Sequence, residues 1–179
     1  QMCIRDSSWA EGDVVRIATD ASSDTVFKGS MCFVAGNGDY RLRTRETKAS
    51  TDELELEALT LALKYLLKVG VRKAVIESDS VAALEAVEQI VHKRGSKASR
   101  PGRTWRGVSS GARSRFQQAW GDIQGQCEVD IRRVLGHAGD PLNRAADQIA
   151  YMGLRAIAHP MKQSRETLRE GIQKALLAL

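Results

Sequence analysis

The sequence has few of the residues that would crosslink a fold or anchor it in a membrane. Its 179 residues include three cysteines (Cys3, Cys32 and Cys127), an odd number without the spacing of a zinc site. Even the apolar stretch 59–67 is interrupted by Lys64 and is far shorter than a membrane span. The N-terminus lacks the basic segment followed by an apolar run that is typical of a secretory signal. These absences favour a single domain in a reducing cytosol over a disulfide-rich or membrane protein.

Acidic residues are missing from one stretch of the chain. Residues 89–121 contain eight lysines and arginines and no aspartate or glutamate. Subtracting these eight from the 27 basic residues of the chain leaves 19 elsewhere, against 22 acidic residues. A mildly acidic body with one basic segment indicates a localised contact with a polyanion.

The remaining pattern alternates between strands and helices. Strands are predicted at 14–19, 26–35, 40–47, 73–77 and 129–135, with a hairpin turn at 36–39. Helices are predicted at 50–69, 81–91, 109–123, 140–158 and 164–177. This order describes a mixed sheet flanked by helices. An unpatterned lead-in at 1–13, flexible or non-native, precedes it, and a helical extension at 160–179 follows it.

Several carboxylates occupy positions where a solvated side chain is not expected. Asp20 and Asp79 each follow a predicted apolar strand, and the ligand sites of open α/β sheets gather at such strand ends. The alternative for each is a helix cap or a turn. In the helix that begins near Ser50, Glu55 falls on the apolar line of the helix, whereas Glu57 falls on the polar face and is predicted to be solvated.

A carboxylate on an apolar line must be paired, protonated or bound to a metal, because burying a bare charge is costly. Asp147 repeats the pattern of Glu55, since it shares a partly apolar line with Ala150 and Leu154. The alternatives are a helix-end residue still reached by water for Glu55, and a favourable charge near a helix N-terminus for Asp147. Four carboxylates near the inner ends of strands and helices can form one site for two hard cations.

Four segments resemble the four motifs of type I ribonuclease H, in the same order and with the same intervening elements. They are residues 17–22, 55–59, 76–80 and 136–147, and the last is the longest and most specific. The resemblance implies an α/β, ribonuclease H-like fold with a five-stranded mixed sheet, three strands antiparallel and two parallel, flanked by helices. The first and fourth strands would be adjacent and parallel at its centre. The catalytic domain would cover residues 14–159.

The resemblance also implies hydrolysis of the RNA strand of RNA/DNA hybrids, giving 5′-phosphate and 3′-hydroxyl ends. By the motif match, the metal-binding carboxylates are Asp20, Glu55, Asp79 and Asp147, which would hold two Mg²⁺ or Mn²⁺ ions. His137 matches a loop histidine that helps to position the attacking water or to release product. Carboxylate ligands suit these ions, whereas a single histidine and no spaced cysteines argue against zinc.

The basic segment at 89–121 resembles in position the family's basic protrusion, which holds the hybrid. The candidate substrate-binding residues are Lys97, Arg100, Arg103, Trp105 and Arg106, and the alternative is a solvated loop. The sequence departs from the family at residues 22–25, which replace a glycine-rich stretch. It also departs at Thr51 and Asp52, where many members have asparagines. The C-terminal helix has no counterpart.

Three functions are compatible with these motifs. The leading one is a metal-dependent endonuclease acting on RNA/DNA hybrids, expected to be a cytoplasmic monomer with no membrane association. The second is a DNA nuclease or polynucleotidyl transferase of the same fold, although such proteins usually have other carboxylate spacings. The third is a non-catalytic hybrid-binding module, which would gain nothing from four acids facing phosphates.

Overall fold

One mixed sheet of five strands organises the chain. The computed structural model describes Trp9 and residues 12–24, 27–46, 48–92, 108–135, 139–160 and 164–179. The strand order is β3-β2-β1-β4-β5. The strands are β1 (Val14–Ser23), β2 (Gly29–Ala35), β3 (Tyr40–Arg45), β4 (Lys73–Ser78) and β5 (Glu128–Arg133). β1–β2 and β2–β3 pair antiparallel, and β1–β4 and β4–β5 pair parallel, which confirms the predicted sheet.

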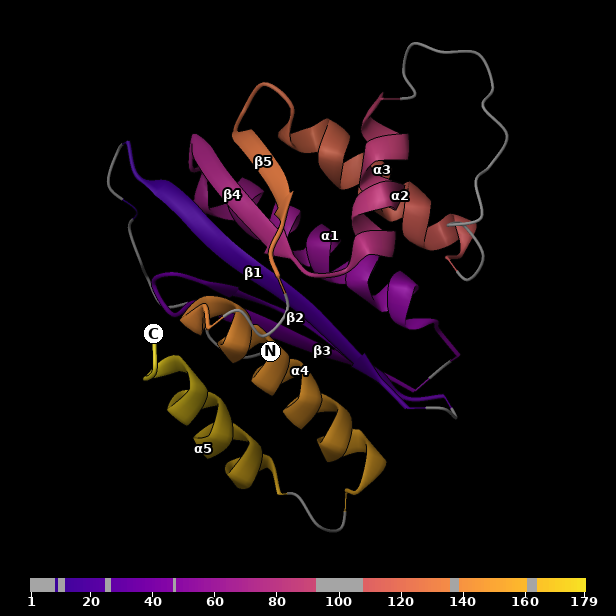
Figure 1. Ribbon diagram of the computed structural model, residues 1–179, viewed down its shortest axis with the longest axis vertical. Coiled ribbons are helices and arrows are strands. Elements are labelled where there is room, and N and C mark those ends of the chain that lie inside the picture. Colours follow the sequence, from indigo (N-terminus) through magenta and orange to yellow (C-terminus); the bar gives the residue numbers. More distant parts are fainter. Residues whose placement is uncertain are drawn as a thin grey trace.

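Helices cover both faces of this sheet (Figure 1). On one face lie α1 (Thr51–Val69), α2 (Val81–His92) and α3 (Ser110–Ile123), and on the other lie α4 (Pro141–Ala158) and α5 (Arg165–Leu176). Each face has its own apolar core. Phe33, Leu59 and Phe116 are buried in the first, and Ala18 and Ile149 in the second. None of the described helices is both long and apolar enough to cross a membrane.

Local sequence signals set the helix ends. The side chains of Ser50, Asp140 and Ser164 accept hydrogen bonds from backbone amides of the first turns of α1, α4 and α5, as N-cap residues do. Gly70 ends α1 with a φ of 70°, a left-handed conformation that glycine adopts without steric cost. The helix boundaries predicted from these residues are confirmed.

β1 is longer than the sequence predicts. The prediction ended the strand at residue 19, but the strand continues to Ser23. The cause is the antiparallel pairing with β2, which extends as far as Ser23 opposite Gly29. The parallel pairing with β4 ends earlier, at Ala18 opposite Glu77. Asp20 therefore lies inside β1, but just beyond the last residue of β1 that pairs with β4.

α5 packs on α4, so the C-terminal helix is part of the second core. Ile172 and Ala175 of α5 are buried in the same apolar cluster as Ala145 of α4. Gly171 allows the two helices to approach closely, because a Cβ atom at this position would lie 2.5 Å from the sulfur of Met152.

Candidate active site

Three carboxylates from distant parts of the chain meet beside the sheet. Asp20 of β1, Glu55 of α1 and Asp79, which follows β4, each offer one carboxylate oxygen, and these oxygens lie within 4.8 Å of one another. Asp20 is 9% exposed and Glu55 4% exposed. Like charges at this separation repel each other, so the packing of the fold holds the three side chains together.

The carboxylate of Glu55 has a partner at one oxygen only. The backbone amide of Ala21 donates a hydrogen bond to Oε1 at 3.2 Å. Oε2 is buried and has no hydrogen-bond partner. A buried carboxylate oxygen in this state is unfavourable unless it is protonated or binds a cation. An unpartnered oxygen within a cluster of oxygen ligands fits a hard divalent cation such as Mg²⁺ or Mn²⁺.

Burial and mutual repulsion favour the neutral forms of the two buried acids. Burial, followed by the charges of Asp79 and Asp147, raises the pKa of Asp20 to about 7. Burial also raises the pKa of Glu55 well above its usual range, and the charges of Asp20 and Asp79 add to the effect. A cation bound between these groups would reverse this balance, because it stabilises the ionised forms.

Asp147 lies at the edge of this cluster. The helical pattern placed it on a partly apolar line, but in the structure its side chain is exposed on α4. Its oxygens are not among the three that meet, yet its charge contributes to the raised pKa of Asp20. The fold thus gathers three of the four predicted carboxylates and sets the fourth beside them, toward solvent.

Two side chains of β2 hold α4 in the orientation that brings Asp147 near Asp20. Cys32 donates a hydrogen bond from Sγ to the carbonyl of Ala146 at 3.2 Å, and Ser30 donates one from Oγ to the carbonyl of Ala150. These two carbonyls lie before and after Asp147 in the helix. Cys32 therefore has a structural role in docking α4 against the sheet.

An ion-pair network surrounds Glu77, which is buried on β4, between β1 and β5. Its carboxylate accepts hydrogen bonds from Arg16 and Arg132, each at 2.7 Å. Arg16 also donates to Asp140, the N-cap of α4, at 2.8 Å, and this bond lowers the pKa of Asp140. No motif in the sequence predicts this network, although an acidic residue in the apolar strand that ends at Ser78 is a signal for it.

The chain on both sides of His137 is anchored to strands of the sheet. On one side, the backbone amide of Val134 donates to the carbonyl of Ser78 at 3.0 Å, one residue before Asp79. On the other side, Asp140 pairs with Arg16. His137 itself lies outside the described residues, so its role at the site stays a prediction.

Two further glutamates of α1 are engaged with neighbouring elements. Glu53 is buried and accepts from Arg45 of β3 and from the backbone amide of Ser109, each at 2.8 Å. Glu57 is half-buried and accepts from Arg45 at 3.2 Å and from Arg115 of α3. The prediction that Glu57 is solvated is wrong, because β3 and α3 cover this side of α1.

Glu53→Gln is expected to destabilise the protein by about 1–3 kcal/mol, since a neutral amide cannot replace the charged partner of Arg45 and Ser109. Burial by itself would raise the pKa of Glu53, but the bonds from Ser109 and Arg45 together lower it. The stabilisation is therefore present above the ordinary pKa of a glutamate and is lost as pH falls through the folded value. Urea unfolding at pH 7 measures the effect, with Glu88→Gln on the exposed side of α2 as control. Equal midpoints for the two variants would refute it.

The five candidate substrate-binding residues of the basic segment all lie outside the described residues: Lys97, Arg100, Arg103, Trp105 and Arg106. Of the eight cations in this segment, Arg113 and Arg115 belong to α3. Arg115 forms an ion pair with Glu57 while remaining about half exposed, so it stabilises the contact between α1 and α3.

A comparison with protein families identifies the domain that carries this site. The family model for RNase H matches residues 12–155. The chain belongs to the RNase H family. The matched range of this RNase H protein contains all four carboxylates and His137, and it ends before α5. Membership of the family supports nuclease activity on RNA/DNA hybrids.

A solved structure shares the fold. The N-terminal RNase H domain of rv2228c from Mycobacterium tuberculosis, solved as a fusion with maltose-binding protein, is similar with a TM-score of 0.57 and 17% sequence identity. The match covers 82% of this RNase H chain and 97% of that chain. The comparison with curated proteins gave no match.

Proposed function

We propose that this protein is a metal-dependent endonuclease that hydrolyses the RNA strand of RNA/DNA hybrids and leaves 5′-phosphate and 3′-hydroxyl ends. The carboxylate cluster is the observation that carries the proposal, because three oxygens lie within 4.8 Å of one another and a buried oxygen of Glu55 has no partner. In a protein that only binds hybrids, negative charge placed where phosphates must approach would weaken the binding. The cluster therefore favours catalysis over a purely binding role.

Asp20, Glu55, Asp79 and Asp147 would hold two Mg²⁺ or Mn²⁺ ions. When bound, these ions would supply an activated water molecule and stabilisation of the charge that develops on the leaving 3′-oxygen. The chain contributes rigid placement of the donors. Glu55 is oriented by the amide of Ala21, Asp20 lies in a paired strand, and Asp79 lies between β4 and the start of α2. Donors fixed before substrate arrives need no reorganisation during the reaction.

The proposal is tested with labelled RNA/DNA hybrid, double-stranded RNA and duplex DNA, each incubated in Mg²⁺ and then in EDTA. We expect cleavage of the RNA strand of the hybrid alone, stopped by EDTA, with product 5′ ends that lose phosphate to a phosphatase. Cleavage of duplex DNA would instead support a DNA nuclease of the same fold. Hybrid binding without cleavage would support the non-catalytic module.

His137→Ala is expected to reduce turnover by about 10²-fold or less, at the low end of what one group that positions water or transfers a proton contributes. The carboxylate cluster stays intact in this variant, so cleavage continues at a reduced rate. Single-turnover cleavage with the protein in excess over hybrid measures the effect. A loss as complete as that of Asp20→Asn would show that His137 is a metal ligand or a structural residue.

The basic segment should account for much of the salt dependence of hybrid binding. Each phosphate neutralised in B-DNA contributes about −0.9 to the slope of log affinity against log salt. We expect that changing Lys97, Arg100, Arg103 and Arg106 together to serine flattens this slope and raises KM, with little effect on kcat. Trp105→Ala should add a smaller loss that depends little on salt.

Binding of the same hybrid in Ca²⁺, which blocks cleavage, gives the slopes of the wild type and the fourfold variant. Equal slopes would show that this segment does not contribute to the binding surface.

A further inference from the structure

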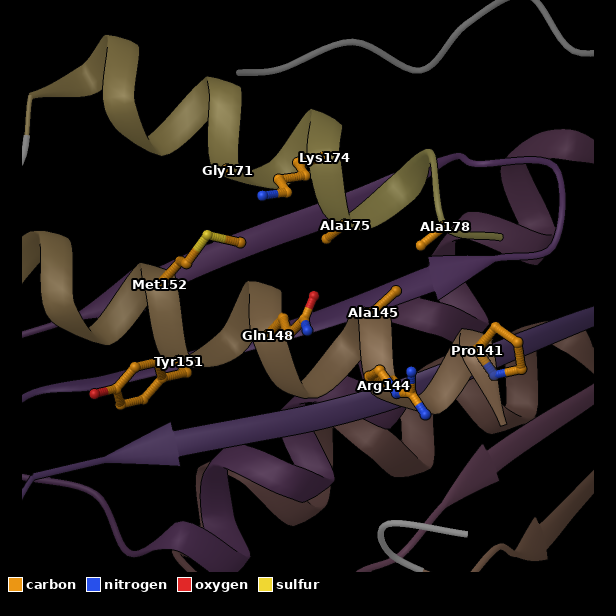
Figure 2. A pocket seen from close by; sticks show the side chains of 10 residues that line it. All are labelled: Pro141, Arg144, Ala145, Gln148, Tyr151, Met152, Gly171, Lys174, Ala175 and Ala178. Carbon is orange, nitrogen blue, oxygen red and sulfur yellow. The ribbon is translucent and has the colours of Figure 1, made fainter. Parts of the chain in front are cut away.

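A groove between α4 and α5 has no role in the proposed reaction. Its volume is about 490 Å³, within the range of about 300–1,000 Å³ found for ligand sites. Met152 and Lys174 lie in the space between the two helices in Figure 2, and Arg144 and Tyr151 lie along α4. Because the family match ends at residue 155, the wall that α5 contributes is additional to the family's domain.

One rim of the groove lies beside Asp147 on α4. Arg144 and Tyr151 stand three residues before and four residues after Asp147 in α4, and residues with these spacings are neighbours on one helix face, with Cβ atoms about 5–6 Å apart. Asp147 is itself exposed and interacts with Asp20. The cluster, Asp147 and the rim of the groove thus follow one another across α4.

The lining of the groove combines positive charge with aromatic and apolar surface. Arg144 and Lys174 are exposed cations, and no acidic residue is among the described residues that line the groove. Tyr151 is 51% exposed and is held by Arg155, which donates to its hydroxyl at 3.3 Å and lies 5.8 Å from the centre of its ring. Cations next to an aromatic platform are typical of surfaces that bind single-stranded nucleic acid.

We propose that this groove binds a single-stranded tail of a hybrid substrate, with phosphates against Arg144 and Lys174 and a base against Tyr151. The inference rests on the proposed function, because the tail reaches the groove while the adjoining duplex is held at the carboxylate cluster. The duplex tethers the tail next to the groove at high effective concentration, so a weak contact adds measurably to affinity. The amide of Gln148, which also lines the groove, offers a donor and an acceptor to a base edge.

The experiment compares a blunt hybrid with hybrids that carry a tail of about six nucleotides, placed in turn on the RNA or the DNA strand and at either end. Binding is measured in Ca²⁺. At least one tailed hybrid should bind the wild type on the order of tenfold more tightly than the blunt hybrid. The ratio of tailed to blunt affinity should fall close to one in a double variant that combines Arg144→Gln and Lys174→Gln. It should also fall close to one in the single variant Tyr151→Ala. The matched control, Arg165→Gln with Arg169→Gln, removes two exposed cations of α5 that do not line the groove, and should keep the ratio.

Each result decides between the proposals. Equal affinity for tailed and blunt hybrids, or a ratio that the groove variants leave unchanged, would overturn the proposal that the groove binds a single-stranded tail. Cleavage of the blunt hybrid in Mg²⁺ is followed in parallel and reports on the proposed function alone. Normal cleavage without a tail effect rejects only the groove, whereas absence of cleavage from every hybrid rejects the proposed function and this inference with it. The substituted side chains are exposed, and melting temperatures verify that the variants fold.

Discussion

Asp20→Asn should reduce cleavage of RNA/DNA hybrids by about 10³-fold or more while leaving hybrid binding intact. Asparagine keeps the shape of the side chain but removes one charge from the group of three carboxylates whose oxygens lie within 4.8 Å of one another. The affinity of such a group for divalent cations depends on its negative charge, so the variant should hold the ions more weakly and lose the chemistry that they would supply. Hybrid binding depends on other contacts. Single-turnover cleavage in Mg²⁺ and equilibrium binding in Ca²⁺ measure the two effects separately.

Glu55→Gln and Glu57→Gln form a matched pair for this prediction, since the two residues are neighbours in α1. Glu55 belongs to the cluster, so its variant should lose activity as Asp20→Asn does. Glu57 pairs with Arg45 and Arg115, so its variant should cleave at a rate close to that of the wild type. Comparable losses in the two variants would reject the assignment of Glu55 as the ligand.

The second large effect is on the stability of the metal-free protein. The pKa of Asp20 rises from 3.8 to about 7 on folding, so the folded state binds more protons than the unfolded state between these values. The contribution of protonated Asp20 to the free energy of unfolding is therefore fully present below the unfolded pKa. It is lost as pH rises through about 7, where the folded group ionises. A shift of this size corresponds to about 4 kcal/mol at most. In EDTA, Asp20→Asn should be more stable than the wild type at pH 8, and the difference should close near pH 4.

Urea unfolding of both proteins across this pH range checks the prediction, because titrating groups away from the carboxylate cluster affect both proteins alike. Asp130→Asn, at an exposed position of β5, is the control and should show no such pH-dependent gain. Millimolar Mg²⁺ should raise the melting temperature of the wild type more than that of Asp20→Asn, because it binds the folded state. A variant less stable than the wild type at pH 8 would contradict a repulsive cluster.

Much of this architecture was predictable because its causes are local. The N-caps at Ser50 and Asp140 and the helix end at Gly70 depend on hydrogen bonds and backbone conformations within a few residues. The hairpin between β2 and β3 follows from a short turn sequence. Glu55 stood out from Glu57 because a helix repeats every 3.6 residues, which separates an apolar line from a polar face without knowledge of the partner.

Tertiary structure alone decided the features that depend on which elements lie against each other. Asp20 is inside a strand because of its pairing with β2, and Glu53 is buried because β3 and the start of α3 cover one side of α1. Asp147 is exposed because α4 turns its other side to the sheet, and the groove exists because α5 packs on α4. The sequence of one helix or strand predicts which residues share a face of that element. Burial and charge pairing depend instead on contacts between segments far apart in the chain, which the sequence of one segment does not indicate.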